Sequence, residues 1–97
     1  MSAADLLPQV LEPLLEDFKY WFDRSQQFLS SHRLPFLEES QQADLLRRVE
    51  ETQKSIAAAA TMFQLSEKKV AIDPALVMEW HQLLMECQAV AMRYRQQ

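Results

Sequence analysis

The stretch from Leu7 to Leu29, LPQVLEPLLEDFKYWFDRSQQFL, decides the fold class. Its apolar residues follow one another at alternating intervals of four and three residues, which is the repeat of an amphipathic α-helix and not of a β-strand. The main line is Leu7, Leu11, Leu14, Phe18 and Trp21, continued by Ser25 and Phe28, with Leu15, Phe22 and Leu29 beside it. We expect this line to face the core.

The prolines bracket the first helix. Asp5 suits an N-cap, which puts Pro8 in the first turn, where no backbone hydrogen bond is lost. Pro13 lies deeper, so that it either kinks the helix or marks its start. Pro35 disfavours helical conformation at Leu34 and ends the helix before it.

Two further amphipathic stripes follow. The second stripe consists of Leu45, Val49, Thr52, Ile56, Ala59 and Phe63. The third consists of Leu76, Trp80, Leu83, Cys87, Val90 and Tyr94. The third helix has the clearest start, because Asp73 is a capping residue and Pro74 suits the first helical position. Ile72 can then contact Val77 as a hydrophobic staple.

Three helices over about residues 5–32, 38–65 and 74–96 predict a single all-α domain over residues 1–97. Because the connectors are short, the helices should pack as an antiparallel up-down-up three-helix bundle. In this topology basic residues meet the acidic start of the second helix at one end: His32, Arg33, Arg93 and Arg95 beside Glu38 and Glu39. From the second connector, Val70 and Ile72 should pack back onto the core.

The composition excludes several classes of function. Glycine is absent, although roughly 7% is usual, and this removes phosphate-binding glycine loops and dinucleotide fingerprints. Ten basic residues against 14 acidic ones leave a net charge of −4, so the chain lacks the positive field that nucleic-acid binding requires. No stretch offers the ~20 apolar residues of a membrane span, and Asp5 replaces the basic region of a signal peptide. With one cysteine, we expect a cytoplasmic protein.

The residues that could carry chemistry are few and scattered. Cys87 is expected in the core, because it lies on the third stripe and free cysteines are commonly buried. His81 lies on a different face of the same helix, and His32 lies at a helix end. The Glu-x-x-His pairs of di-iron proteins are absent, and Glu12 and Glu16 are expected to be solvated carboxylates that point away from the core. We therefore expect no enzyme, no catalytic, cofactor-binding or metal-binding residue, and no cofactor.

The aromatic residues of the first helix allow two interpretations. Core packing accounts for those on the stripes, including Trp21 and Trp80. The alternative is a ligand pocket built around these two tryptophans, between the first and third helices. Tyr20 projects off the apolar face, and Asp17 and Arg24 border the same face, where they can pair.

A second apolar line marks the third helix. Met78, Met85 and Met92 recur at intervals of seven residues, and at about 100° per residue they project almost opposite the core stripe. Exposed methionines suit an adaptable protein-binding surface, although methionine is also a helix former tolerated at surfaces. The candidate interface consists of Met78, Met85, Met92, His81, Asp17, Tyr20 and Arg24.

Three stretches, EPLLEDFKYWF at residues 12–22, QADLL at 42–46 and WHQL at 80–83, resemble a family of short, all-helical cyanobacterial proteins of unknown function. The resemblance covers nearly the whole chain and implies a cyanobacterial, cytoplasmic origin. It assigns no catalytic or ligand-binding residues. The function expected is that of a non-catalytic interaction module that self-associates or docks on another protein, with a small-ligand carrier or sensor as the alternative.

Overall fold

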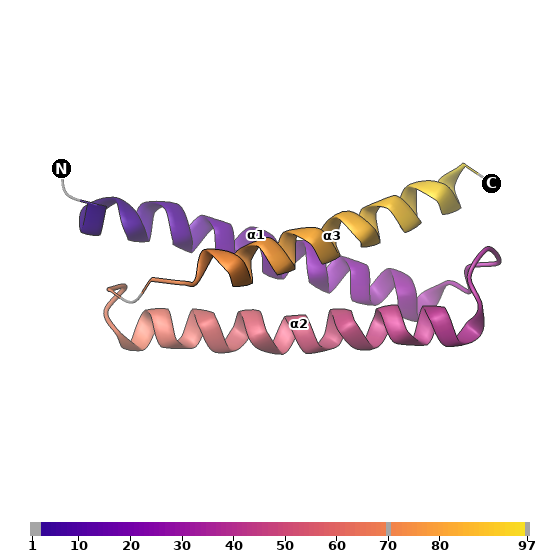
Figure 1. The fold of residues 1–97 in the computed structure, drawn as a ribbon, viewed down its shortest axis with the longest axis horizontal. Coiled ribbons are helices and arrows are strands. Elements are labelled where there is room, and N and C mark those ends of the chain that lie inside the picture. Colours follow the sequence, from indigo (N-terminus) through magenta and orange to yellow (C-terminus); the bar gives the residue numbers. More distant parts are fainter. Residues whose placement is uncertain (1–2, 70, 97) are drawn as a thin grey trace.

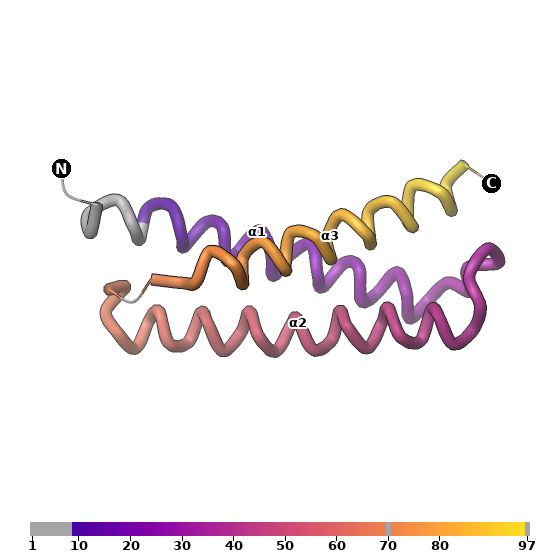
Figure 2. The backbone as a smooth tube through the Cα atoms, in the orientation of Figure 1, coloured from indigo at the N-terminus to yellow at the C-terminus, as the bar shows by residue number. Residues whose placement is uncertain are grey.

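The computed structural model describes residues 3–69 and 71–96. For residues 3–8 it describes the backbone but not the side chains. It contains three α-helices: α1 (Ala3–Ser31), α2 (Glu39–Leu65) and α3 (Pro74–Arg95). In Figure 1, α2 runs back along α1, and α3 returns in the direction of α1. Figure 2 shows the two connectors at opposite ends of the molecule. With no strand in the described ranges, the all-α three-helix bundle is confirmed.

The start of α1 differs from the prediction. The helix begins at Ala3, so Asp5 lies within it and is not its N-cap. The helix also continues through Pro13, which therefore does not begin it. Buried side chains on either side of this proline, Leu11 and Leu15, pack in the core and offset the lost backbone hydrogen bond. The side chains of residues 5–8 lie outside the described part, as does Val70.

The start of α3 agrees with the prediction. The carboxylate of Asp73 accepts a hydrogen bond from the backbone N–H of Ala75 at 2.9 Å, and Pro74 occupies the first turn. Ile72 and Val77 both pack against the core. The connector therefore returns to the core at Ile72, as expected.

The core runs along the line where the helices meet. Its buried members are Leu11, Leu15, Phe18, Phe22, Leu29, Leu34, Leu45, Val49, Ile56, Phe63, Trp80, Leu83, Leu84 and Cys87. Trp21, expected on the core stripe, is 43% exposed, and this expectation was wrong. The long helix α2 covers the flank of α1 that carries Leu15, Phe22 and Leu29, which shifts the core away from Trp21.

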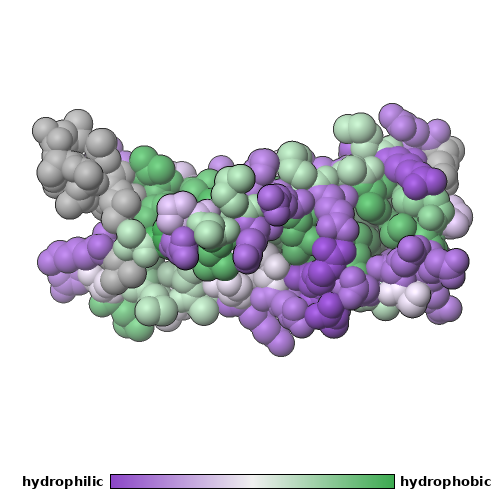
Figure 3. Space-filling view, viewed as in Figure 1, coloured by the Kyte–Doolittle hydropathy of each residue, from purple (hydrophilic) through white to green (hydrophobic). Residues whose placement is uncertain are grey.

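The bundle is elongated, with extents of 50 × 22 × 20 Å and a radius of gyration of 15.5 Å. A compact chain of this length has a radius of gyration near 12.5 Å, by the usual scaling (~2.2·N^0.38). Each helix therefore keeps a long outward face. On the face seen in Figure 3, hydrophobic side chains form separate patches with a hydrophilic band between them.

A buried amide closes the corner between α1 and α2. Nε2 of Gln42 donates to the carbonyl oxygens of Leu29 at 3.0 Å and His32 at 2.6 Å. Its Oε1 accepts from the backbone N–H of Leu34 and from Nη1 of Arg33, both at 2.9 Å. Gln42 is 8% exposed and uses its full hydrogen-bonding capacity. The sequence analysis assigned it no structural role.

Three of the four basic residues expected at this end of the bundle contact rings or carbonyl groups: His32, Arg33 and Arg93. The guanidinium of Arg93 lies 4.3 Å from the ring centroid of Phe36, and the His32 ring lies 5.3 Å from that of Tyr94. Arg33 donates to the Leu37 carbonyl at 2.8 Å. Among the described residues, none of these basic groups forms an ion pair with an acidic one.

The end of α2 stores backbone strain. Glu67 and Lys68 have φ angles of 59° and 66°, in the left-handed region that favours glycine. The Lys68 N–H donates to the Phe63 carbonyl at 2.8 Å, and the Glu67 N–H donates to the Gln64 carbonyl at 3.0 Å. These two bonds form a Schellman motif, which usually has glycine at the position of Glu67.

We expect Glu67→Gly to raise the free energy of unfolding by about 0.5–1 kcal/mol, because it removes the left-handed strain. Urea denaturation followed by circular dichroism measures this change. Lys69→Gly is the matched control. It removes the same ion pair with Glu67, but Lys69 itself does not have a positive φ, so the change relieves no strain. Loss of stability in both variants would show that no strain is relieved at Glu67.

Candidate functional site

The methionine row predicted from the sequence lies at the surface of α3. The exposed fractions are 55% for Met78, 45% for Met85 and 54% for Met92. They project away from Trp80 and Cys87, which are buried on the opposite side of the same helix. The predicted exposure of the row is thus confirmed.

The methionines belong to an outward face of α3 that carries no charge. We call this surface the α3 face, and it consists of Ala75, Met78, His81, Gln82, Met85, Gln88, Ala89 and Met92. All are exposed except Gln88, which is half-buried. The charged residues of α3, Glu79, Glu86, Arg93 and Arg95, lie on its flanks. In a chain that is 25% charged, a helix face of this length without charge resembles the centre of an interface more than a solvated surface.

The flank of the α3 face toward α2 is fixed by an ion pair. Arg48 of α2 donates to Glu86 through its two terminal guanidinium nitrogens, Nη1 at 2.9 Å and Nη2 at 2.7 Å. Arg48 also contacts Asp44 at 3.1 Å. The hydrogen bonds from Arg48 lower the pKa of Glu86 and outweigh the opposing effect of burial. The negative charge of Glu86 is therefore already compensated within the chain.

The flank toward α1 carries exposed aromatic residues. Nη1 of Arg24 donates to the hydroxyl of Tyr20 at 3.0 Å, and its guanidinium lies 5.9 Å from the ring centroid of Trp21. Tyr20 is 52% exposed, as expected from its position off the apolar stripe. The suggested pair between Asp17 and Arg24 is not formed. Seven residues span about 10.5 Å along a helix, so Arg24 reaches Tyr20, one turn away, instead.

A groove of about 420 Å³ separates α1 from α3 beside this flank. Its lining residues are Trp21, Arg24, Ser25, Phe28, Leu29, Cys87, Gln88, Ala91, Met92 and Arg95. Trp80 does not line it, because its ring packs against Phe18 at a centroid distance of 5.6 Å and is 2% exposed. The pocket built from both tryptophans is therefore not formed. Of the two tryptophans, only Trp21 lines the groove.

The thiol of Cys87 is the only one in the chain, and it is buried. Burial raises the pKa of the Cys87 thiol to about 11, against a smaller lowering by Ser25. The thiol is thus protonated near neutral pH, whereas thiolate is the reactive form.

We expect alkylation of Cys87 by iodoacetamide at pH 8 to be on the order of 100-fold slower in the native protein than in denaturant. Burial lowers both the thiolate fraction and the access of the reagent. Mass spectrometry of timed samples gives the two rates. Similar rates would contradict the buried, protonated state.

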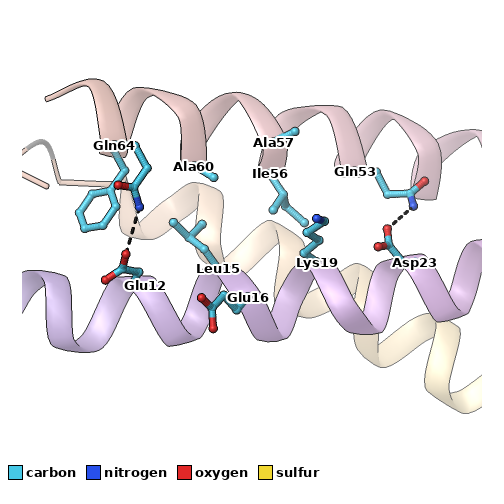
Figure 4. Close-up of a pocket in the computed structure, with 11 residues that line it drawn as sticks. Glu12, Leu15, Glu16, Lys19, Asp23, Gln53, Ile56, Ala57, Ala60 and Gln64 are labelled. Carbon is cyan, nitrogen blue, oxygen red and sulfur yellow. Dashed lines mark hydrogen bonds between the residues drawn. The ribbon is translucent and has the colours of Figure 1, made fainter. Parts of the chain in front are cut away.

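A second groove, of about 330 Å³, lies between α1 and α2 (Figure 4). Its apolar lining residues are Leu15, Ile56, Ala57, Ala60 and Phe63. A polar bridge crosses each end. Gln64 donates to Glu12 at 3.0 Å, and Gln53 donates to Asp23 at 2.8 Å, so that these bridges tie α1 to α2.

Glu12 has partners that the sequence did not predict. Its side chain keeps 35% of its surface exposed, as a solvated carboxylate would, but the carboxylate is also paired, with Lys68 3.0 Å from its Oε1. Hydrogen bonds from Lys68 and then Gln64 lower the pKa of Glu12. Glu16 is exposed, as expected, at the edge of the groove.

The described residues include no candidate metal site and no candidate membrane-spanning helix. Among the described side chains, no group of three or more His, Cys, Asp or Glu residues is placed to hold a metal ion. Within the described ranges, no helix has the length and apolar character that crossing a membrane requires.

A family model with the description "Protein of unknown function (DUF2605)" matches residues 1–96 of the chain. No curated protein and no solved structure matches it.

Proposed function

The chain belongs to the DUF2605 family, whose function is unknown, and from this premise we propose that it is a non-catalytic helical module that binds another protein chain through the α3 face. One observation carries the proposal: the α3 face is uncharged, and its three methionines are about half exposed.

The energetics of the α3 face favour association. Completing the burial of each methionine contributes about 1 kcal/mol, or about half of the value for a full side chain. Because the charged residues of α3 lie on the flanks, association removes no charge from water at the centre of the face. The thioether chains adapt their shape to the partner.

Site-specific photo-cross-linking tests the proposal. The photoreactive residue benzoyl-phenylalanine replaces Met85 in the full chain, produced in cells that naturally make the protein. The matched control places it at Ala58, which is exposed on α2. We expect cross-linked protein products from position 85 and few from position 58. Equal yields at the two positions, or none at position 85, would overturn the proposal.

The α1–α3 groove supports a second candidate function, the binding of a small amphipathic anion. Trp21 and Phe28 give the groove aromatic walls, and Arg24 and Arg95 add two cations. Neither arginine pairs with a carboxylate among the described residues. An apolar tail with an anionic head is complementary to these groups.

Dodecyl phosphate tests this second candidate below its micelle concentration, with dodecanol as the uncharged control. Trp80→Phe leaves Trp21 as the only tryptophan, so that its fluorescence reports on the groove. A saturable change with the phosphate, absent with dodecanol and in Arg24→Gln/Arg95→Gln, would support the candidate. An unchanged spectrum would eliminate it.

Origin and location are also part of the proposal. The resemblance of residues 12–22 supports a cyanobacterial origin. The single cysteine is compatible with a reducing cytoplasm.

A further inference from the structure

This inference rests on the proposed function and names the partner: we propose that the α3 face docks on the α3 face of a second copy of the chain, with the two helices antiparallel. The argument depends on the repeat of the seam, the charges on its flank and the fit of opposing side chains.

The centre of the α3 face has the repeat of a coiled-coil seam. Its residues recur at alternating intervals of three and four: Ala75, Met78, Gln82, Met85, Ala89 and Met92. All six are exposed, and they lie on the side of α3 opposite the core. Such a repeat keeps one face of a helix turned toward a partner helix over its whole length.

The flank beside this seam is complementary to itself in the antiparallel direction. Glu79, Glu86 and Arg93 recur there at intervals of seven residues. When two copies run antiparallel, like flanks meet, so Glu79 faces the partner's Arg93 and the partner's Glu79 faces Arg93. Both residues are available, since neither forms an ion pair among the described residues.

The middle of the flank would bring the two Glu86 carboxylates together. Each is already bound by the two terminal guanidinium nitrogens of Arg48 from its own chain, which compensates the charge. Arg93 rests on the Phe36 ring, which leaves guanidinium donors for a carboxylate.

A parallel pair lacks this complementarity. In parallel coiled coils the two opposite flanks meet, with an offset of five residues. Glu86 would then face the partner's His81, and Arg93 would face the partner's Gln88, so no Glu–Arg pair forms. The charge pattern therefore favours the antiparallel arrangement.

The antiparallel register also fits side chains by size. It places Ala75 opposite the partner's Met92, Met78 opposite the partner's Ala89 and Gln82 opposite the partner's Met85. Each long methionine then lies against a small or flexible residue, as close packing between helices requires. All six positions fall within α3, which ends at Arg95.

Disulfide trapping distinguishes the two directions. In the antiparallel pair, a mixture of Met78→Cys and Ala89→Cys proteins forms a cross-linked dimer under mild oxidation. Met78→Cys alone forms none, because its two copies lie about 16 Å apart along the axis. Wild type controls for Cys87, which is buried. Cross-linking of Met78→Cys alone, as in a parallel pair, would overturn the inference.

Sedimentation equilibrium tests the charge pairs. We expect wild type to associate from 11.4 kDa toward twice that mass with rising concentration. Glu79→Arg should weaken association about tenfold, since two Arg–Arg contacts replace two ion pairs, and Glu79→Arg/Arg93→Glu should restore it. A wild type that stays at 11.4 kDa, or no restoration in the double variant, would overturn the inference. If the protein is a monomer but photo-cross-linking at position 85 still captures other proteins, this inference fails and the proposed function does not.

Discussion

Replacement of Gln42 by leucine is expected to lower the free energy of unfolding by about 3–5 kcal/mol, although leucine is apolar and the site is buried. The Gln42 amide satisfies the carbonyl groups of Leu29 and His32 and the backbone N–H of Leu34. Without the amide these groups lose their partners, and each buried unsatisfied group costs about 1–3 kcal/mol. Urea denaturation followed by circular dichroism measures the loss.

Gln27→Leu is the control for this change, because Gln27 is exposed on α1. Its effect should stay within about 0.5 kcal/mol. Gln42→Glu should also destabilise, since a carboxylate directed at two carbonyl oxygens replaces a donor. A Gln42→Leu protein as stable as wild type would show that the corner does not depend on the amide.

Phe22→Ala is expected to cost about 3–5 kcal/mol of stability. The Phe22 side chain is 0% exposed and stacks with Phe18 at a centroid distance of 6.2 Å, so truncation leaves a cavity in the middle of the core. The neighbouring residue provides the control. Trp21→Ala should cost only about 1 kcal/mol, because Trp21 is 43% exposed and leaves no closed cavity.

Thermal and urea denaturation of the two variants locate the core side of α1. We expect Phe22→Ala to be much less stable than Trp21→Ala, because the Phe22 ring is buried and the Trp21 ring is partly exposed. The reverse order, or equal losses, would mean that α1 is rotated and that Trp21 faces the core.

The three helices could be predicted because each carries a long apolar stripe with a period near 3.6 residues. For α2 and α3 this stripe also identifies the core, where Val49, Phe63 and Trp80 are buried. The apolar arc of α1 is wider. Periodicity alone does not show which part of it α2 covers, and this is why Trp21 was placed in the core.

Gln42 and Glu12 escaped prediction because their partners are distant in sequence. The amide of Gln42 meets backbone groups eight to 13 residues away, and hydrophobic periodicity contains no sign of this. The bridges of the α1–α2 groove left a weak signal. Glu12 and Asp23 are eleven residues apart, as are Gln53 and Gln64, which matches an antiparallel pairing of the two helices.

Oxidation of methionine by dilute hydrogen peroxide, followed at each residue as a function of protein concentration, tests the central claim most directly. Met62 is 62% exposed on α2 and serves as an internal reference. Docking of two α3 faces predicts that Met78, Met85 and Met92 are oxidised more slowly as concentration rises, while the rate at Met62 stays constant. Rates at all four methionines that do not change with concentration would contradict it.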